Sequence, residues 1–397
     1  MAGTPGALEA SLGRQLLHMR ITEVRAYPTS FQIPAANRVA LGIGTAVKRD
    51  AVIVKVTTDE GLAGWGEAHH GRAHTAVAKL IETTLKQLVV GMDADDVNGV
   101  WDKMYRFQLA SHGMGAGACL AMSGIDMALW DIRGKARSLP LYRLLGGRRK
   151  PIAAYAGGVS LGYQPPPDLI AEARKSIDAG YKAIKLRVGD SPERDIERLR
   201  AVREEFGQAL VVLTDANIGY RLEHVRRVMP VMDELGIGWL EEPFPAHDYR
   251  SYREARTYGR TPLAAGENHY TRFEFNRVLE DGAITILQPD LSKTGGITEA
   301  LRIAALASAW KLPIHPHSSM TGLNHAATIH FLASIDNGGY FEGDVSRGNR
   351  FRDELVANPG EIDRDGNVWP LEAPGLGLEV NEEFLAAHPP IEGPGYI

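Results

Sequence analysis

The sequence is almost free of cysteine, with only Cys119 in 397 residues. A lone cysteine excludes a disulfide within the chain and a thiolate metal cluster, and it fits a reducing cytoplasm, where we expect the protein to reside. No uninterrupted apolar run of about 18 residues occurs, so we expect no spanning helix and no membrane partner. The net charge is -5 and no basic run stands out, so we expect no nucleic-acid partner.

What is present has the composition of a globular protein, with 44% hydrophobic and 23% charged residues. The length allows one domain of about 250 residues and a smaller one. Residues 1–18 form an N-terminal extension before Met19. They lack the charged start and long apolar core of a signal peptide, and we give them no role.

The first third of the chain predicts an α+β capping domain over residues 19–148. Segments 20–31 and 50–68 have the alternation of strands, and the second segment contains a turn at Asp59-Glu60-Gly61. From about Thr75 to Leu145 the apolar spacing becomes helical. An antiparallel sheet followed by helices is typical of an α+β unit.

After Pro151, short apolar segments that end in polar residues alternate with helical stretches. The polar ends recur every 23 to 27 residues, at Asp215, Glu241, Glu267, Asp290, His317 and Glu342. One strand, one helix and two loops take about that many residues in a barrel. We therefore predict a TIM-like (β/α)₈ barrel over residues 149–372. The tail, residues 373–397, is expected to pack back on the capping domain.

The stretch AIKLRVGD, residues 183–190, predicts a strand that carries Lys185 and Arg187 at i and i+2. Alternate strand residues point the same way, so both cations should emerge on one face. Buried like charges repel and lose hydration, so this pair needs an anionic ligand or a surface position. The second cation is an arginine, which does not readily give up a proton.

Three carboxylates, Asp215, Glu241 and Glu267, end three consecutive predicted strands. At one barrel mouth they would repel unless a hard divalent cation neutralised them, and oxygen ligands in an octahedral array suit Mg²⁺. The pattern favours a Mg²⁺ site over three separate solvated acids. Glu242 is the weaker ligand candidate, because it points away from the side of Glu241.

His317 and Asp290 end neighbouring predicted strands, so a hydrogen bond between them is expected, with Asp290 orienting the imidazole as a general acid/base. His315 lies one step deeper on the same face and is the structural candidate. A His-x-His strand end with acids elsewhere could instead bind zinc for hydrolysis. The carboxylate set on other strands argues against that alternative.

Several further residues are candidates for substrate contact. Glu342, if protonated, could donate a hydrogen bond to a developing oxyanion. Asn217 shares the strand face of Asp215. Segments 31–48 and 65–74 could close over the mouth or could be polar surface loops. The remaining candidates are Trp65, His69, Arg72, His269 and Tyr270, with Arg38 and Lys48 proposed for a distal carboxylate.

Together these residues resemble the enolase superfamily, specifically its mandelate racemase subgroup, from Met19 onward. The motifs that carry the likeness are KLR at 185–187, DAN at 215–217, WLEEPF, AGEN, QPDLSKTGGIT, IHPHSS and YFEGD. The resemblance implies the (β/α)7β-type modified form of the TIM barrel. It also implies a Mg²⁺ ion that chelates a substrate carboxylate, held by Asp215, Glu241 and Glu267. It also implies a His317–Asp290 dyad that removes an α-proton, and an enediolate contacted by Glu342 and Lys185.

The chain departs from the family pattern at Arg187, where the second lysine base of a racemase would stand. A racemase needs a base on each face of the α-carbon, and arginine is a poor one. The resemblance therefore implies a dehydratase of an aldonic or aldaric acid that forms a 2-keto-3-deoxy acid. Racemisation, epimerisation and cycloisomerisation are near alternatives, and a non-catalytic barrel is a remote one. A homo-oligomer, from dimer to octamer, is the family habit.

Overall fold

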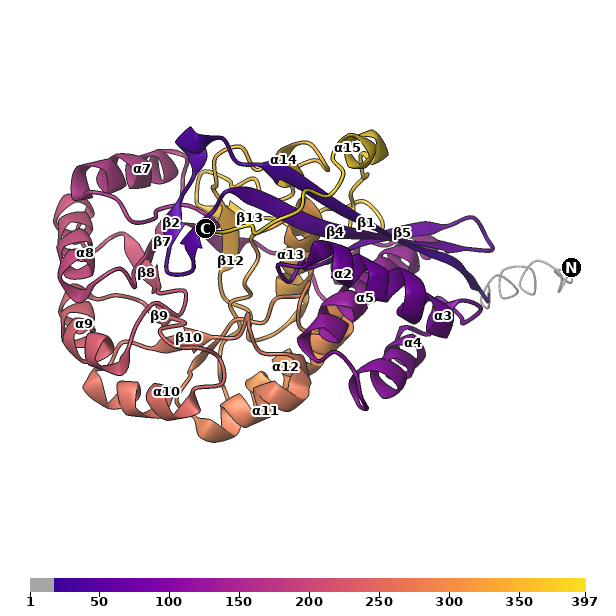
Figure 1. Ribbon diagram of the computed structural model, residues 1–397, viewed down its shortest axis with the longest axis horizontal. Coiled ribbons are helices and arrows are strands. Elements are labelled where there is room, and N and C mark those ends of the chain that lie inside the picture. The colour runs from indigo at the N-terminus through magenta and orange to yellow at the C-terminus, as the bar shows by residue number, and fades with distance from the viewer. Residues whose placement is uncertain (1–17) are drawn as a thin grey trace, which may run out of the picture.

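The computed structural model describes residues 18–397, so nearly all of the predicted N-terminal extension lies outside the described residues. A barrel and a capping domain lie side by side, with the capping domain drawn in indigo and purple (Figure 1). No helix among residues 18–397 has the length and apolar character needed to cross a membrane.

The capping domain is a three-stranded antiparallel sheet covered by helices. The strand order is β1 (Ile21–Gln32), β4 (Lys48–Thr58), β5 (Ala63–Ala68). The helices are α2 (His74–Leu80), α3 (Lys86–Val89), α4 (Val97–Met104), α5 (Ala116–Ala136) and α6 (Leu141–Leu144). A short 3-10 helix, η1 (Ala35–Asn37), and two π-helical segments, η2 (Ile81–Leu85) and η3 (Tyr105–Leu109), accompany them. The sheet and α5 pack so closely that a Cβ at Gly66 would lie only 2.2 Å from the Gly124 carbonyl oxygen. Glycine is therefore required at this contact.

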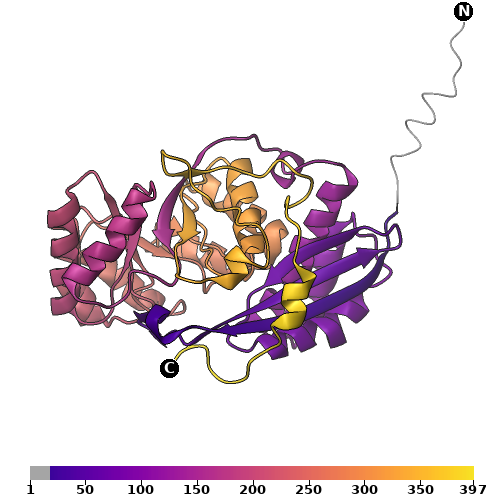
Figure 2. The same ribbon diagram turned by 90° about the horizontal axis from the view of Figure 1, so that it is seen from above.

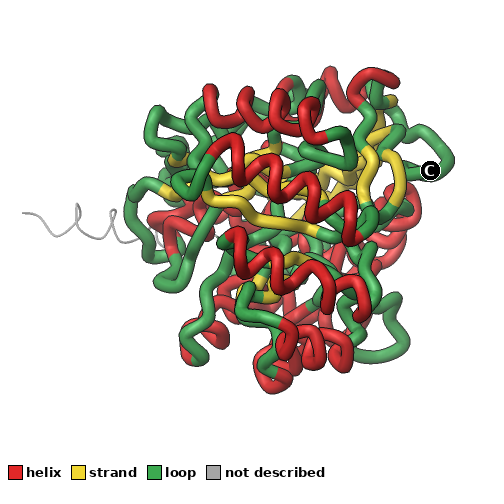
Figure 3. The backbone as a smooth tube through the Cα atoms, turned by 90° about the vertical axis from the view of Figure 1, so that its left-hand side faces the viewer, coloured by secondary structure: helices red, strands yellow, loops and turns green. Residues whose placement is uncertain are grey.

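The barrel is built from parallel strands that alternate with helices. Its strands are β6 (Ile152–Gly157), β7 (Ala183–Arg187), β8 (Val211–Asp215), β9 (Leu240–Glu241), β10 (Leu263–Ala265), β11 (Ile286–Leu287) and β12 (Phe341–Asp344). Its helices are α7 (Pro166–Asp178), α8 (Pro192–Phe206), α9 (Leu222–Leu235), α10 (Tyr249–Ala255) with η4 (Arg256–Tyr258), α11 (Thr271–Asp281), α12 (Gly296–Ala309) and α13 (Gly322–Ser334). The helices cover the outside (Figure 3).

The ring closes through single bridges and a parallel pair. Ile314 bridges Leu287 and Gly338 in place of a longer seventh strand, and β12 pairs with β6 in parallel. Side chains such as Tyr155, Trp239 and Leu213 fill the interior. The predicted barrel with an α+β capping domain is confirmed.

The C-terminal tail returns to the capping domain (Figure 2). After α14 (Arg350–Asp353) and β13 (Asn367–Val368), helix α15 (Glu382–Ala387) lies against the capping sheet, where Lys55 Nζ is 2.6 Å from a Glu382 oxygen. The hairpin β2 (Ala40–Leu41) and β3 (Gly44–Thr45) extends over the barrel, and the Ile397 amide donates to the Thr45 carbonyl at 3.0 Å. The tail and the hairpin together cover one side of the barrel mouth.

Candidate active site at the barrel mouth

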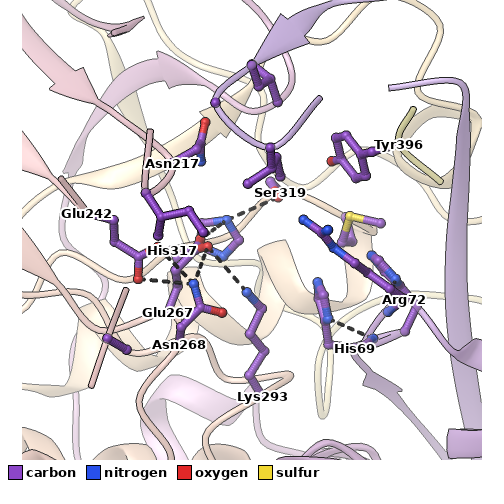
Figure 4. A pocket seen from close by; sticks show the side chains of 18 of the residues that line it. His69, Arg72, Asn217, Glu242, Glu267, Asn268, Lys293, His317, Ser319 and Tyr396 are labelled. Atoms are coloured by element: carbon purple, nitrogen blue, oxygen red, sulfur yellow. Dashed lines mark hydrogen bonds and ion pairs between the residues drawn. The ribbon is translucent and has the colours of Figure 1, made fainter. Parts of the chain in front are cut away.

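A cavity of about 610 Å³ lies between the barrel mouth and the capping domain. Barrel, capping domain and tail all contribute side chains to it (Figure 4). Those with polar groups include Arg187, Asn217, Glu242, Glu267, Asn268, Tyr270, Lys293, His317, Ser319, His69, Arg72 and Tyr396. The cavity is large enough for a small organic ligand and rich in charge.

Lys185 lies beneath the cavity and faces three carboxylates. Its Nζ is 2.9 Å from Glu241 Oε1, 3.1 Å from Glu342 Oε1 and 3.5 Å from Asp215 Oδ2. Burial opposes the charge of Lys185, but Glu241 and Glu342 raise its pKa well above the ordinary value. Lys185 is therefore a fixed cation in the barrel interior.

Arg187 lies two residues further along β7, toward the mouth, and lines the cavity. Its guanidinium donates to the Asp215 carboxylate, to the Gly158 carbonyl and, at 3.2 Å, to Asn217 Oδ1. Burial works against its charge, but Asp215 and the other carboxylates raise the pKa of Arg187 further. Lys185 and Arg187 do emerge on one face, as predicted. The anions that they pair with include carboxylates of the protein itself.

The carboxylates of β8, β9 and β10 divide between the barrel interior and the cavity. Glu241 points inward, where it accepts from Gln288 Nε2 at 2.7 Å and from Trp239 Nε1 at 3.2 Å. Burial raises the pKa of Glu241 to about 7 although Lys185 opposes this shift. Glu267 lines the cavity instead.

Glu242, the weaker ligand candidate from the sequence, also lines the cavity. Its backbone turns with φ of 37°, which aims the side chain at Asn268 Nδ2, 2.8 Å from Oε2. Burial, and then the charges of Glu267 and Asp215, raise the pKa of Glu242 well above its ordinary value. The Glu242 side chain points away from Glu241, as expected. It nevertheless belongs to the site, because it points toward Glu267.

The donor chemistry of this cluster fits Mg²⁺. Five buried carboxylates and the partly exposed Glu267 meet three cations in this cluster. The buried carboxylates are Asp215, Glu241, Glu242, Asp290 and Glu342, and the cations are Lys185, Arg187 and Lys293. Within residues 18–397, no three His, Cys, Asp or Glu side chains stand as a ready-made ligand set, since cations and amides hold these oxygens. The excess of carboxylate leaves room for a divalent cation with oxygen ligands.

His317 sits between two carboxylates at the end of the seventh barrel unit. Its Nδ1 lies 2.6 Å from Asp290 Oδ2, and its Nε2 lies 2.6 Å from Glu267 Oε2. Burial lowers the pKa of His317, but Glu267, Glu342 and Asp290 outweigh burial and raise it to about 10. Asp290 stays ionised, because the contact with His317 lowers its pKa although burial raises it.

His315 lies deeper and does not line the cavity. Its Nδ1 accepts from the Tyr340 amide at 2.9 Å, and its ring lies 5.1 Å from that of Trp239. Burial lowers the pKa of His315 to about 4. The neighbourhood is that of a structural histidine, and it offers no second ligand to accompany His317 in a zinc site.

Glu342 differs from the protonated donor expected from the sequence. It accepts from the Gly158 amide and the Ser318 amide, each at 3.1 Å. Burial favours its neutral form, but Lys185, His317 and Arg187 lower the pKa of Glu342 to about 2. An ionised Glu342 is a hydrogen-bond acceptor that holds Lys185, so the expected role as donor does not match this arrangement.

Among the capping-loop and barrel-end candidates, His69, Arg72 and Tyr270 line the cavity. Trp65 and His269 do not. The Trp65 ring is buried in the capping domain, with Lys55 Nζ 4.7 Å from its ring centre. His269 Nε2 lies 3.1 Å from the Ala246 carbonyl oxygen, among aromatic rings.

Arg38 and Lys48, predicted to contact a distal carboxylate, lie outside the set of residues that line this cavity. Arg38 Nε donates to the Ile33 carbonyl at 3.3 Å, beside a separate cavity of about 180 Å³. Lys48 is buried, 3.0 Å from Asp50 Oδ1 and in contact with the Ile391 carbonyl. Both side chains are engaged away from the mouth.

The sequence reasoning missed several polar cavity residues, among them Asn268, Lys293, Ser319 and Tyr396. Lys293 Nζ lies 3.6 Å from Glu267 Oε1, and that charge with Asp290 raises its pKa although burial lowers it. The position of Lys293 three residues after Asp290, and that of Asn268 directly after Glu267, could have indicated from the sequence that both lie at the barrel mouth. Nothing local marks Tyr396, which reaches the cavity only through the fold of the tail.

Two family models match the chain. The N-terminal domain of the mandelate racemase / muconate lactonizing enzyme family matches residues 24–146, and the enolase C-terminal domain-like family matches residues 168–384. The protein therefore belongs to the mandelate racemase / muconate lactonizing enzyme family of the enolase superfamily, as its motifs predicted.

Relatives of the chain include enzymes named for sugar acids. The chain is 34% identical to arabinonate dehydratase of Saccharolobus solfataricus, over 91% of this chain and 97% of the relative. It is 33% identical to D-galactonate dehydratase of Pectobacterium atrosepticum (84% and 90%) and 30% identical to 3,6-anhydro-alpha-L-galactonate cycloisomerase of Streptomyces coelicolor (89% and 96%). The predicted enzyme class, a lyase with an isomerase as alternative, is confirmed.

Solved structures of the superfamily have the same fold. A member from Polaromonas sp. JS666 superposes with a TM-score of 0.93 at 54% identity, covering 96% of this chain and 100% of that one. A racemase from Streptomyces coelicolor A3(2), solved with bound magnesium, has a TM-score of 0.84 at 28% identity, covering 93% and 99%. Magnesium is thus used within this family.

Proposed function

We propose that the protein is a Mg²⁺-dependent dehydratase that converts an aldonic or aldaric acid into a 2-keto-3-deoxy acid. The observation that carries the proposal is the asymmetry of the site. One side has a titratable dyad, His317 with Asp290, while the KLR motif offers Arg187, bonded to Asp215. With one base, abstraction of the α-proton and departure of the β-hydroxyl suffice, and no second base is needed.

The charged residues divide the work of binding. Asp215, Glu241 and Glu267 would hold Mg²⁺, with Glu242 as a further carboxylate on the cavity side. When bound, the ion would polarise the substrate carboxylate and so acidify the α-carbon. Lys185 and Arg187 supply fixed positive charge beside that carboxylate, which favours the enediolate.

The proton transfers fall to His317. Its neutral Nε2 removes the α-proton, the Cα–H electrons form the enediolate, and the β-hydroxyl then leaves as water after taking a proton. That proton comes from the same His317 or from another acid, for which Lys293 lines the same cavity. The resulting enol takes a proton at carbon and becomes the 2-keto-3-deoxy acid.

The far side of the cavity, built by His69, Arg72 and Tyr396, is proposed to hold the distal end of the substrate. The Arg72 guanidinium lies 5.1 Å from the centre of the Tyr396 ring. Within residues 18–397 it forms no ion pair. A free guanidinium suits a distal carboxylate or several hydroxyls. We also propose a cytoplasmic location and a homo-oligomer.

Cycloisomerisation is a second candidate, because one relative is a cycloisomerase of an anhydro-sugar acid. Such a reaction also begins at the carbon next to a carboxylate. The two candidates differ in whether water leaves, so product analysis separates them.

The test is an incubation of purified protein with Mg²⁺ and pooled aldonic and aldaric acids in D₂O, followed by proton NMR. New methylene signals of a 2-keto-3-deoxy acid support the proposal, and division of the pool identifies the substrate. Loss of an α-proton signal without a keto product would instead indicate a racemase or an epimerase. A His317→Asn variant serves as the inactive control.

A further inference from the structure

Glu67 is a fully buried carboxyl of the capping domain that reaches the barrel. It belongs to β5 and is 0% exposed. The Thr321 hydroxyl donates to Glu67 Oε2 at 2.5 Å, across 254 positions of sequence. Thr321 is the N-cap of α13, where its Oγ1 accepts from the Leu323 amide at 3.1 Å. The contact therefore ties the capping domain to the first turn of a barrel helix.

The same helical turn contacts the proposed acid/base dyad. Asn324, also 0% exposed, donates from Nδ2 to Asp290 Oδ1 at 3.1 Å. The other Asp290 oxygen lies 2.6 Å from His317 Nδ1. A continuous path thus runs from Glu67 through Thr321 and the first turn of α13 to Asp290 and His317. The segment 318–321 joins His317 to the same turn.

The electrostatics fit a structural acid in this place. Burial raises the pKa of Glu67 to about 8, against the effect of the Thr321 hydrogen bond, and the nearby Asp290 raises it further. A neutral carboxyl can be buried beside Asp290 at less cost than a charged one. It also avoids repelling the anion that orients His317.

We propose that Glu67 is a positioning residue, which fixes Thr321 and the first turn of α13 and thereby holds Asp290 in line with His317. Alignment of the dyad then depends on docking of the capping domain. The inference rests on the proposed role of this dyad, but its geometric part is independent of which acid is the substrate.

The experiment compares four variants of the Glu67–Thr321 contact and one control variant with the wild-type protein. Glu67→Ala and Thr321→Val remove the contact, while Glu67→Gln and Thr321→Ser keep a hydrogen bond at the same place. Asp126→Asn is the matched control, because Asp126 is a second buried capping-domain carboxyl that contacts the barrel, accepting from the Thr298 amide at 2.9 Å and not from the dyad. Crystal structures and steady-state kinetics are measured for all.

Glu67→Ala and Thr321→Val should displace Asp290 from His317 and lower kcat by about 10-fold to 100-fold, as misplacement of a catalytic group does. KM should stay within about two-fold, because no substrate contact is removed. Glu67→Gln, Thr321→Ser and Asp126→Asn should keep the dyad geometry and kcat near the wild-type values.

An unchanged dyad and kcat in Glu67→Ala would overturn the proposal. So would an equal loss in Glu67→Gln, since the hydrogen bond would then not be what matters. If Glu67→Ala does not fold, the pair Thr321→Val and Thr321→Ser decides in the same way. If the wild-type protein acts on no sugar acid, the proposed function fails, whereas the crystal structures still decide whether Glu67 sets the position of Asp290.

Discussion

Nε2 of His317 lies 2.6 Å from Oε2 of Glu267. The atom proposed to accept the α-proton thus faces a carboxylate proposed to bind the metal. The same carboxylate keeps His317 protonated, because Glu267 is the strongest of the charges that raise the pKa of His317. Proton and metal therefore compete for one small region of the site.

This competition predicts that Mg²⁺ lowers the pKa of His317. Without the metal the pKa is raised to about 10, so the imidazole is protonated at pH 7. A cation that takes up the charge of Glu267 removes this stabilisation and should lower the pKa by about one unit or more. Carbon–proton NMR of the imidazole, assigned through His317→Asn, measures the value with and without Mg²⁺. Equal values at saturating Mg²⁺ would mean that Glu267 is not a ligand.

The same relationship predicts proton release on metal binding. Mg²⁺ affinity should rise with pH between the pKa of His317 in the metal-bound protein and its value of about 10 without the metal, because His317 gives up its proton over this range as the metal binds. Calorimetry in two buffers of different ionisation enthalpy counts the protons released. An affinity independent of pH would contradict the competition.

The dyad itself makes a graded prediction for activity. His317→Asn should abolish α-hydrogen exchange in D₂O, a loss of about 10²-fold to 10⁴-fold for a general base. Asp290→Asn should lose less and should lower the pKa of His317, because the Asp290 contact is one of the causes that raise it. The pH dependence of kcat/KM then shifts to lower pH. A larger loss in Asp290→Asn than in His317→Asn would exclude His317 as the base.

The basic residues around the mouth separate by position. Arg72→Ala should raise KM by about 10-fold or more, the effect of losing a charged hydrogen-bond partner. Arg38→Ala should leave KM within about two-fold, because Arg38 lies outside the cavity. Steady-state kinetics on the substrate found by NMR tests both. An effect of Arg38→Ala equal to that of Arg72→Ala would place the distal end of the substrate elsewhere.

The barrel and its catalytic face could be predicted from the sequence because their determinants are local and periodic. The two-residue alternation put Lys185 and Arg187 on one face, and the recurring strand ends brought His317 next to Asp290. The mouth's outer wall could not be predicted in this way. Lys48 contacts Ile391, 343 positions away, so its orientation follows from how the tail packs.

Tyr396 and Glu67 illustrate the same limit. Tyr396 reaches the cavity because Ala46 bridges it within the capping domain. Glu67 stands in the GWGE stretch, which from the sequence could be a loop or a strand end. Its proposed role follows only from the hydrogen bond that Thr321 donates to it. Contacts between elements far apart in the chain leave no periodic signal.

The raised pKa of Glu67 leads to a prediction of how the free energy of unfolding depends on pH. Its pKa is raised from 4.5 to about 8 in the folded protein. Between these values the unfolded chain loses the proton while the folded protein keeps it, so stability falls as pH rises, by about 1.4 kcal/mol per pH unit from this group. Glutamine has no such proton, so the stability of Glu67→Gln relative to the wild type should increase by about 4 kcal/mol from pH 5 to pH 8.

Denaturant unfolding at pH 5, 6, 7 and 8 measures the difference between the two proteins, with Glu60→Gln as an exposed control for the exchange of a carboxyl for an amide. The gap between Glu67→Gln and the wild type should be small at pH 5 and widen steadily toward pH 8. A constant gap would mean that Glu67 is ionised in the folded protein over this range. An ionised Glu67 would repel Asp290. The hydrogen bond from Thr321 to Glu67 would then have to offset this repulsion, which a neutral Glu67 does not exert.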